Sequence, residues 1–331
     1  MAKLMRWLTV PAVALAGFFG VLQLLPSPDS PQALEEAETG VLSVVRVPYE
    51  RRMVQAGPHR LHTLVIGDGS KPPLVMIHGH GGGLGVFAQN FDALSEAYTI
   101  YAVDLLGWGR SDRPRFTGRT AEEAQAWWVD SLEAWRAEVG LEQFTLLGHS
   151  MGGFVAASYA LAHPEQVSHL ILVDSGGLTR PVHPYNGIYF NLPPQRLVRV
   201  AGPLGPALVR WGRKEELSRG PYNDYSLTDY YYQISAAPAS GEVAFRKLLG
   251  VREWAIPLLE PLADLTMPVT LIWGEGDTLI SPQTARRAHE LVPTSELVII
   301  PGAGHSPHQE TPHLFNLAVL DSQFRERERG D

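Results

Sequence analysis

The sequence Thr145-Leu146-Leu147-Gly148-His149-Ser150-Met151-Gly152-Gly153 joins a predicted buried strand directly to a predicted helix. A strand that turns at once into a helix holds its central residue in a strained backbone conformation, and small flanking residues permit the close turn. Such a turn exposes the hydroxyl group of Ser150 at the carboxyl end of a sheet. The first helical amide, that of Met151, points toward any oxygen that becomes negatively charged there. Ser150 is therefore the candidate nucleophile, and Met151 is a candidate oxyanion donor.

Short apolar runs alternate with helical patterns on both sides of this turn. The runs that we interpret as strands are Val44–Val47, Leu61–Ile66, Leu74–Ile77, Ile100–Val103, Phe144–Leu147, Leu170–Val173, Val269–Trp273 and Leu297–Ile300. The first two should form a hairpin, and the others should be buried on both faces. Helices should begin at the capping box of Thr120 and Glu123 and at Ser281-Pro282. This alternation predicts an α/β fold with a mostly parallel eight-stranded sheet flanked by helices.

One region interrupts the alternation. Residues 176–262 are rich in Pro, Gly, Tyr and Trp, and we interpret them as an inserted, mainly helical cap. Residues 26–43 begin with a Pro/Ser run and are predicted to be a linker. Residues 44–331 are then predicted to form a single domain that carries the cap.

The N-terminal segment, residues 1–25, is hydrophobic. Lys3 and Arg6 precede an almost uncharged stretch from Trp7 to Leu25, and these nineteen residues at about 1.5 Å each can just cross a hydrocarbon core of about 30 Å. We predict an uncleaved signal anchor that holds the domain at a membrane, with the basic residues on the cytoplasmic side. A cleaved signal peptide, which would give an exported protein, and an interfacial helix are the alternatives.

A second glycine-rich stretch, His78-Gly79-His80-Gly81-Gly82-Gly83, directly follows a predicted strand. Its glycines allow the backbone to approach a substrate carbonyl group, and we predict the amide of His80 as a second oxyanion donor. A simple flexible turn is the alternative. His78 is expected to be structural, and Asp104 and Arg110, which lie in the turn after the next strand, are expected to brace the floor of the site.

Two later segments supply the groups that a serine nucleophile needs. The glycines of Pro301-Gly302-Ala303-Gly304-His305 can bring the imidazole of His305 back over Ser150, where it would act as the base. Asp277, which follows another predicted strand, is predicted to orient this imidazole and to stabilise its charged form. The rivals are His308 and His313 for the base and Asp174 and Glu275 for the acid.

The composition excludes several classes of site and partner. The chain contains no cysteine, which rules out disulfides, cysteine-ligated metals and a thiol nucleophile. The formal net charge is −8, so no nucleic-acid partner is expected. A serine–histidine–carboxylate mechanism needs neither a metal nor a cofactor, and none is predicted.

The motifs resemble those of the α/β-hydrolase superfamily along nearly the whole chain from Val44, including the chain order Ser150, Asp277, His305. One branch is more similar. It is the abhydrolase-domain group that contains an N-acyl phospholipid lysophospholipase and its serine-less relative, a coactivator of a triglyceride lipase. The similar stretches are His78–Gly83, Asp104–Ser111, Arg113–Phe116, Leu147–Phe154, Arg199–Pro206 and Ser240–Phe245. The last two lie in the predicted cap and are the most specific, because cap sequences diverge most.

The chain also departs from that branch. It keeps Ser150, as the active members do. The branch has its acid where this chain has Ser281, whereas Asp277 occupies the more general superfamily position. The His-x4-Asp acyltransferase-like element of the branch ends here at Glu310, which weakens the expectation of acyl transfer. The hydrophobic N-terminal segment is not a feature of the branch.

This resemblance, together with the aromatic cap and the N-terminal segment, implies a serine hydrolase that cleaves carboxylic esters of acyl lipids through an acyl-enzyme. Lysophospholipids or monoacylglycerols are the favoured substrates, and the membrane is a partner through the N-terminal segment. One alternative is an S33-like aminopeptidase with the same triad, in which Glu215-Glu216 or Glu253 would hold the amino terminus of the substrate. Another is a non-enzymatic, membrane-tethered lipid-binding coactivator, against which Ser150 argues.

Overall fold

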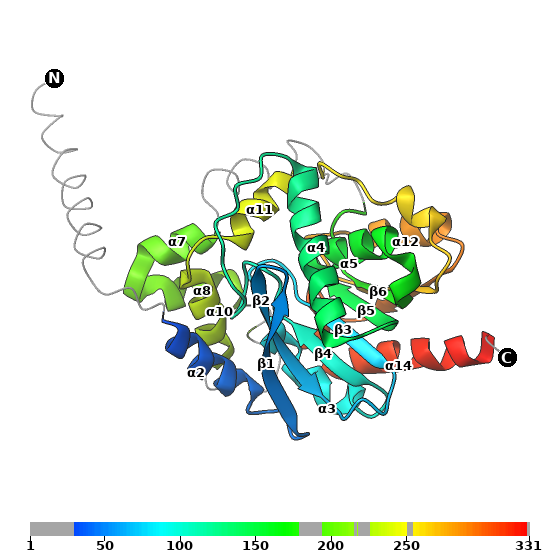
Figure 1. Cartoon of the computed structure of the whole chain (residues 1–331), viewed down its shortest axis with the longest axis horizontal. Helices are drawn as coiled ribbons and strands as arrows, with labels where there is room; N and C mark the ends of the chain where they lie inside the picture. The colour runs from blue at the N-terminus through cyan, green and yellow to red at the C-terminus, as the bar shows by residue number, and fades with distance from the viewer. Residues whose placement is uncertain (1–29, 179–193, 215–216, 218–225, 250–253, 330–331) are drawn as a thin grey trace, which may run out of the picture.

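The computed structural model describes residues 30–178, 194–214, 217, 226–249 and 254–329. An eight-stranded sheet with the order β1-β2-β4-β3-β5-β6-β7-β8 forms its centre (Figure 1). The strands are β1 (Tyr49–Ala56), β2 (His59–Ile66), β3 (Pro73–Ile77), β4 (Thr99–Val103), β5 (Phe144–His149), β6 (Val167–Val173), β7 (Val269–Gly274) and β8 (Ser295–Ile300). The pairs β1/β2 and β2/β4 are antiparallel, and every other neighbouring pair is parallel. The α/β fold predicted from the sequence is thus confirmed.

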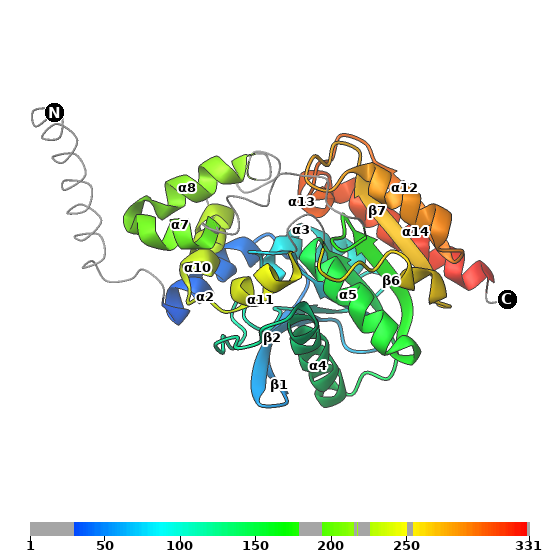
Figure 2. The same cartoon turned by 90° about the horizontal axis from the view of Figure 1, so that it is seen from above.

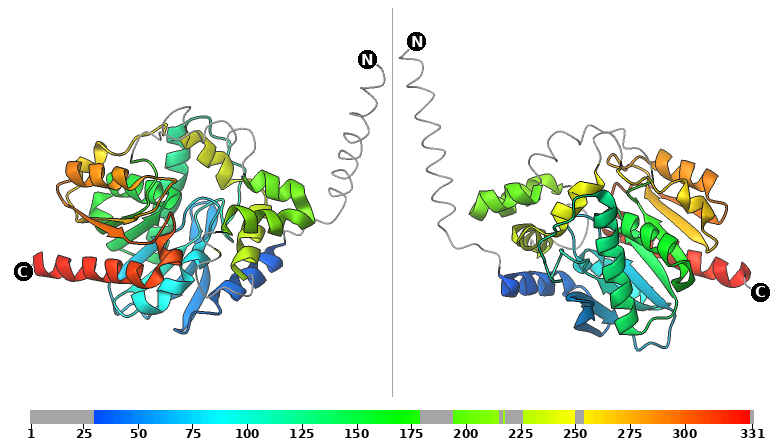
Figure 3. Two further views of the ribbon diagram at one scale, coloured as in Figure 1. Left: turned by 180° about the vertical axis from the view of Figure 1, so that it is seen from behind. Right: turned by 45° about the horizontal axis from the view of Figure 1, so that its top comes forward.

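Helices pack on both faces of this sheet. The α-helices are α2 (Pro31–Leu42), α3 (Ala88–Leu94), α4 (Ala121–Val139), α5 (Met151–Ala162), α7 (Pro194–Ala201), α8 (Gly205–Gly212), α10 (Ser226–Ala236), α11 (Gly241–Leu248), α12 (Pro282–Leu291), α13 (Pro307–Glu310) and α14 (Pro312–Arg329). The 3-10 helices are η1 (Leu84–Phe87), η2 (Pro164–Gln166), η4 (Gly202–Leu204) and η5 (Pro261–Asp264). Helices α4 and α5 cover one face, and α3 and α14 cover the other (Figures 1 and 3). This double cover explains why β5 and β7 are buried at every residue.

Two predicted helix starts are confirmed. The side chain of Thr120 accepts from the amide of Glu123, and the carboxylate of Glu123 accepts from the amide of Thr120, which forms the predicted capping box of α4. Ser281 caps α12 through the amide of Gln283. These signals are local, because each depends on side chains within one turn of the helix start.

The hairpin differs from its prediction at the first strand. Val44–Val47 is not a strand; β1 begins at Tyr49 and pairs with β2 across a turn at Gly57. Strand β1 lies at the edge of the sheet, where only Val54 and Ala56 are buried. It therefore lacks the apolar run by which the other strands were predicted. Val44 and Val47 instead pack, partly buried, against the core.

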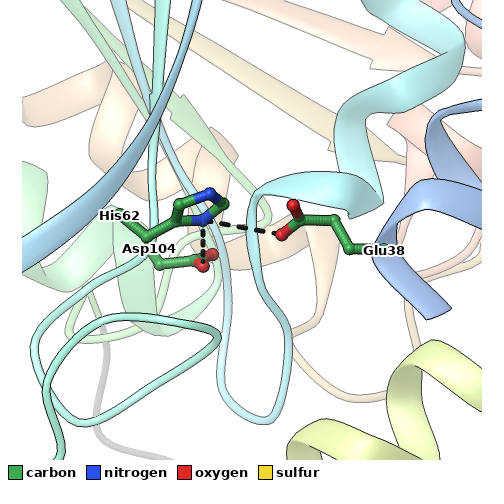
Figure 4. A group of neighbouring side chains, drawn as sticks. All are labelled: Glu38, His62 and Asp104. Carbon is green, nitrogen blue, oxygen red and sulfur yellow. Dashed lines mark hydrogen bonds and ion pairs between the residues drawn. The ribbon is translucent and has the colours of Figure 1, made fainter. Parts of the chain in front are cut away.

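The structure also differs from the predicted linker, because residues 31–42 form helix α2. Ser30 caps this helix through the amide of Ala33, and Leu34, Val41 and Leu42 are buried. On the same buried face, the carboxylate of Glu38 lies 3.5 Å from Nδ1 of His62, which itself hydrogen-bonds Asp104 (Figure 4). Helix α2 is therefore anchored to the domain by apolar packing and by a buried charged cluster.

Helices α7, α8, α10 and α11 lie between β6 and β7, where the cap is predicted. Helices α7, α8 and α10 gather with α2 at one end of the molecule, α11 packs against α4, and α14 extends at the opposite end (Figures 1 and 2). The predicted anchor, residues 1–25, lies outside the described residues. Among the residues that the structure describes, no helix has the length and apolar character needed to span a bilayer.

The strand order determines where a ligand can bind. Strand β3 lies between β4 and β5, so the chain winds in opposite directions on its two sides. In open α/β sheets, ligands bind beyond the carboxyl ends of the strands at such a switch point. The segments after β3 and β5 are the two glycine-rich stretches identified in the sequence, which contain His80 and Ser150.

Candidate active site

Ser150 occupies a strained turn between β5 and α5. Its φ of 55° and ψ of −116° lie in a region that residues with a side chain rarely adopt. A Cβ atom at Gly148 would lie 2.3 Å from the carbonyl oxygen of Gly152, and one at Gly152 would lie 2.4 Å from the carbonyl oxygen of His78. Both glycines are therefore needed for the strand to turn into the helix beside β3, and the turn holds the Ser150 side chain at the carboxyl end of the sheet.

Three of the predicted site residues meet in one hydrogen-bonded chain. Oγ of Ser150 lies 2.9 Å from Nε2 of His305, and Nδ1 of His305 lies 2.8 Å from Oδ2 of Asp277. The other oxygen of Asp277 accepts from the amides of Leu279 and Ile280. Burial raises the pKa of Asp277, but the hydrogen bond and charge of His305 and the amide of Ile280 outweigh burial and leave that pKa below its usual range. Asp277 is thus held as a carboxylate against the imidazole.

The rival acids are placed differently. Glu275 is exposed. Asp174 is fully buried behind Asp277, accepts from the amide of Gly274, and has a φ of 41°. Burial, and then the charge of Asp277, raise the pKa of Asp174 well above its ordinary value. Its protonated carboxyl group can therefore donate to Asp277, which makes Asp174 a neighbour of the acid rather than a substitute for it.

The rival bases do not reach Ser150 in this arrangement. His313 is exposed at the start of α14. His308 is buried, and its ring centroid lies 4.5 Å from that of His149. Burial, and then the charge of His305, lower the pKa of His308 to about 3. His308 is thus a neutral packing partner at the back of the site.

The loop that carries His305 is fixed by two side chains that the sequence reasoning did not assign to this role. Glu310 accepts from the amides of Gly304 and Ser306, the two residues that flank His305. Nε2 of His149 lies 2.7 Å from the carbonyl oxygen of His305, to which it donates. The signal for Glu310 was the His-x4-Glu spacing, and the signal for His149 was its place beside Ser150.

The segments that carry the predicted oxyanion donors both lie beside Ser150. Met151 is the first residue of α5, where amides have no partner within the helix. A Cβ atom at Gly79 would lie 3.0 Å from Cβ of Ser150, so the stretch that leads to His80 runs directly against the nucleophile. The His80 ring stacks on Phe245 with centroids 4.4 Å apart, and burial above all lowers its pKa to about 3.

The residues expected to brace the floor do so. His78 donates through Nδ1 to the carbonyl oxygen of Gly79 and accepts through Nε2 from the amide of Leu105. Buried Asp104 accepts from the amides of Leu84 and Arg110 and thereby ties the turn after β4 to the turn after β3.

A cavity of about 510 Å³ lies above Ser150 and His305. Most of its walls are apolar side chains from the cap and from the loop after β7; examples are Leu197, Val198, Leu208, Val209, Trp211, Phe245, Trp254, Leu279 and Ile280. Arg213 also lines it, with its guanidinium 3.9 Å from the ring centroid of Tyr231. The cavity is thus suited to an acyl chain and contains one permanently cationic side chain among its described lining residues.

Comparison with known proteins agrees with this geometry. The family model described as "alpha/beta hydrolase fold" matches residues 72–312. A "1-acylglycerol-3-phosphate O-acyltransferase" of Arabidopsis thaliana is 36% identical over 88% of this chain and 80% of its own length. A human "(Lyso)-N-acylphosphatidylethanolamine lipase" is 35% identical over 86% of this chain and 90% of its own length.

Solved structures share the same architecture. The crystal structure of a membrane phospholipase A, described as a bacterial virulence factor, has a TM-score of 0.73, is 24% identical and covers 99% of both chains. A Bacillus subtilis carboxylesterase has a TM-score of 0.69, is 22% identical, and covers 88% of this chain and 98% of its own. The chain therefore belongs to the α/β-hydrolase family, in the branch that includes the (lyso)-N-acylphosphatidylethanolamine lipases.

Proposed function

We propose that the chain hydrolyses carboxylic esters of acyl lipids, with Ser150 as nucleophile, His305 as base and Asp277 as the acid that orients the base. The observation that carries this proposal is the unbroken hydrogen-bonded chain from Ser150 Oγ through both nitrogens of His305 to Asp277, at 2.9 and 2.8 Å. It opens into an apolar cavity rather than into packed core. A serine, an imidazole and a carboxylate in this order form the triad of acyl-transfer enzymes.

In the proposed reaction, Nε2 of His305 takes the proton of Ser150 as Oγ attacks the ester carbonyl carbon. The amides of His80 and Met151 stabilise the negative charge that develops on the carbonyl oxygen. The C–O bond to the alcohol then breaks, and His305 returns the proton to the leaving alkoxide. A water molecule, deprotonated by His305, attacks the acyl-enzyme; the ester bond to Ser150 then breaks, Oγ takes the proton back from His305, and the fatty acid is released.

We further propose that a lysophospholipid fits the site better than a monoacylglycerol. Arg213 lines the cavity, and its charge acts on His80 and His149, which flank the nucleophile. A phosphate ester pairs well with a guanidinium group, whereas an uncharged glycerol gains little from it. The similarity to a human (lyso)-N-acylphosphatidylethanolamine lipase supports the same substrate class.

The two alternatives make different demands on the site. An aminopeptidase needs carboxylates in the cavity to hold a charged amino terminus, and the described lining residues contain no Asp or Glu. Glu215, Glu216 and Glu253 lie outside the described residues. A non-catalytic coactivator would leave the Ser150–His305 pair without a role.

The test is fatty-acid release from lysophosphatidylethanolamine, lysophosphatidic acid and monoacylglycerol that share one acyl chain. We expect the lysophospholipids to be cleaved fastest, and Ser150→Ala to abolish release and fluorophosphonate labelling without unfolding the chain. Arg213→Gln should lower kcat/KM for the lysophospholipids about tenfold and change that of monoacylglycerol little. Release that persists in Ser150→Ala would refute the mechanism, and an unchanged substrate ratio in Arg213→Gln would refute the headgroup contact.

A further inference from the structure

The outer surface of the cap carries a concentration of exposed apolar side chains. Five of the ten exposed large apolar residues in the described chain lie on α7, η4 and α8, and Leu204 and Trp211 are the most exposed, at 54% and 79%. The five residues, which we call the cap patch, are Leu197, Val200, Leu204, Leu208 and Trp211. Folded proteins rarely leave large apolar side chains gathered in water unless the surface meets a partner.

Helices α7 and α8 expose the cap patch to solvent. Val198 and Val209 are buried, and α7 and α8 both contact α10. Two patch residues lie three positions apart on α7 and two lie three positions apart on α8, which places each pair on one face of its helix, and Leu204 lies on η4 between them. The two helices lie side by side at the end of the molecule (Figures 1 and 2).

Charge distinguishes this surface from the rest of the chain. Residues 194–214 contain five Arg or Lys and no Asp or Glu, in a chain whose net charge is −8; Glu215 and Glu216 follow. Arg196, Arg210 and Lys214 are exposed beside the patch, whereas Arg199 pairs with Glu242. Helices with an apolar face and basic flanks lie in the headgroup region of anionic bilayers.

The patch is continuous with the cavity. Leu197, Leu208 and Trp211 are exposed at the surface and also line the cavity above Ser150. The first described helix, α2, packs against α10 at the same end of the molecule. The hydrophobic N-terminal segment precedes α2 in the sequence.

We propose that the α7–α8 surface docks on an anionic phospholipid bilayer, with the cap patch in the headgroup region and the cavity mouth against the membrane. A second copy of the chain is a poorer partner, because a twofold contact would bring two basic surfaces together. Docking in this orientation gives an acyl chain a path from the bilayer to the cavity that avoids water. The contact is separate from the N-terminal segment and from the three residues of the proposed triad.

Because the chain has no cysteine, a single Leu204→Cys substitution accepts an environment-sensitive dye at one place only. Leu317→Cys is the matched control, since Leu317 is similarly exposed but lies on α14, a helix that is separate from the cap (Figure 1). The full-length labelled proteins are mixed with vesicles of phosphatidylcholine that contain about 30 mol % phosphatidylglycerol, or none. Both labelled proteins contain the N-terminal segment, so binding through that segment alone would affect the two dyes equally. A difference between the dyes therefore reports contact of the cap patch with the bilayer.

We expect the dye at position 204 to shift to the blue and to be quenched by spin-labelled lipid, and the dye at 317 to do neither. The affinity for vesicles, measured with the dye at position 204, should be lower for pure phosphatidylcholine than for vesicles with phosphatidylglycerol, and lower in high salt than in low salt. Each basic residue that loses an anionic partner should lower it about fivefold. Equal responses at 204 and 317, or no response at 204, would overturn the proposal. A dye at 204 that is already protected without vesicles, in a protein that sediments as a dimer, would show that a second copy covers the patch. Neither readout uses ester hydrolysis, so failure here and failure of the proposed activity are distinguishable.

Discussion

Two carboxylate–imidazole pairs lie within this domain, and they are built from the same atoms. Nδ1 of His62 lies 3.0 Å from Oδ2 of Asp104, and Nδ1 of His305 lies 2.8 Å from Oδ2 of Asp277. Each carboxylate also accepts from two backbone amides. The geometry of the pair alone would therefore assign both to the same chemistry.

Their surroundings separate them. Nε2 of His305 faces Ser150 and the cavity, whereas Nε2 of His62 faces the guanidinium of Arg110 at 3.4 Å (Figure 4 shows the ring between its carboxylates). Glu38 closes the second site, and Arg51 and Arg110 pair with it. These two guanidinium groups supply the positive charge that a metal ion would otherwise bring to three such ligands. The two pairs differ in the surroundings of Nε2. In His305 this nitrogen faces Ser150 and the cavity, and in His62 it faces a guanidinium group.

The largest expected effect is on activity, when the His305–Asp277 pair is broken. His305→Ala should lower kcat about 10⁴-fold, because Ser150 loses its base, and should leave the unfolding midpoint nearly unchanged. His62→Ala should lower kcat less than tenfold per folded molecule and should lower the unfolding midpoint instead. Steady-state hydrolysis of a soluble ester and urea unfolding measure both. The contrast between the two pairs fails if His62→Ala is as inactive as His305→Ala while still folded.

The next largest effect is expected on stability, when the cluster of Glu38, His62 and Asp104 loses one of its arginines. Arg110→Ala leaves Arg51 as the one guanidinium group paired with the fully buried carboxylate of Glu38, and breaking a buried charge pair costs about 3 kcal/mol of unfolding free energy. Arg60→Ala is the matched control, because its ion pair with Asp112 is partly exposed and should contribute less than about 1 kcal/mol. Equal losses in the two variants, measured by urea unfolding, would show that Glu38 does not depend on Arg110.

These two pairs also show which features the sequence could predict. Ser150, Asp277 and His305 each follow a strand of a recognisable parallel sheet, and the carboxyl ends of such strands meet at one edge, so local patterns were enough to bring them together. Helix α2 was missed because a glutamate, Glu38, occupies its buried face, and that placement makes sense only beside Arg110, which is distant in the sequence. The Ser30-Pro31 start was the available signal.

The supports of the proposed triad were unpredictable for a related reason. Asp174 and Glu310 act through backbone amides and through a neighbouring carboxylate, and these contacts depend on how the loops fold. The His-x4-Glu spacing singled out Glu310 but did not show which backbone amides its carboxylate contacts. Sequence patterns thus predicted the residues of the proposed triad and not the contacts of the groups that hold them.

Asp174 offers a pH test of one such support. Its pKa in the folded protein lies well above the ordinary 3.8, so the folded state keeps a proton that the unfolded state has lost, and stability falls as pH rises from 3.8 toward the raised pKa. Asp174→Asn, which keeps the acceptor for Gly274 and a donor toward Asp277, should remove this dependence. The variant should gain stability relative to wild type by at most about 1.4 kcal/mol per pH unit, measured by urea unfolding at pH 6 and pH 8. Parallel stability curves would mean that Asp174 is ionised when folded.

The smallest expected effect concerns the His305 loop. Glu310→Gln replaces one of the two oxygens that accept from the amides of Gly304 and Ser306 with an NH₂ group, so one amide loses its acceptor and the imidazole is held less firmly. We expect kcat, and the rate at which a fluorophosphonate labels Ser150, to fall together about tenfold while KM stays constant. Exposed Glu165 provides the control as Glu165→Gln, which should change neither rate. A Glu310→Gln variant that is less stable but labels at the wild-type rate would show that Glu310 supports the fold alone, and the difference between the two histidine pairs would then lie entirely in Ser150 and the cavity.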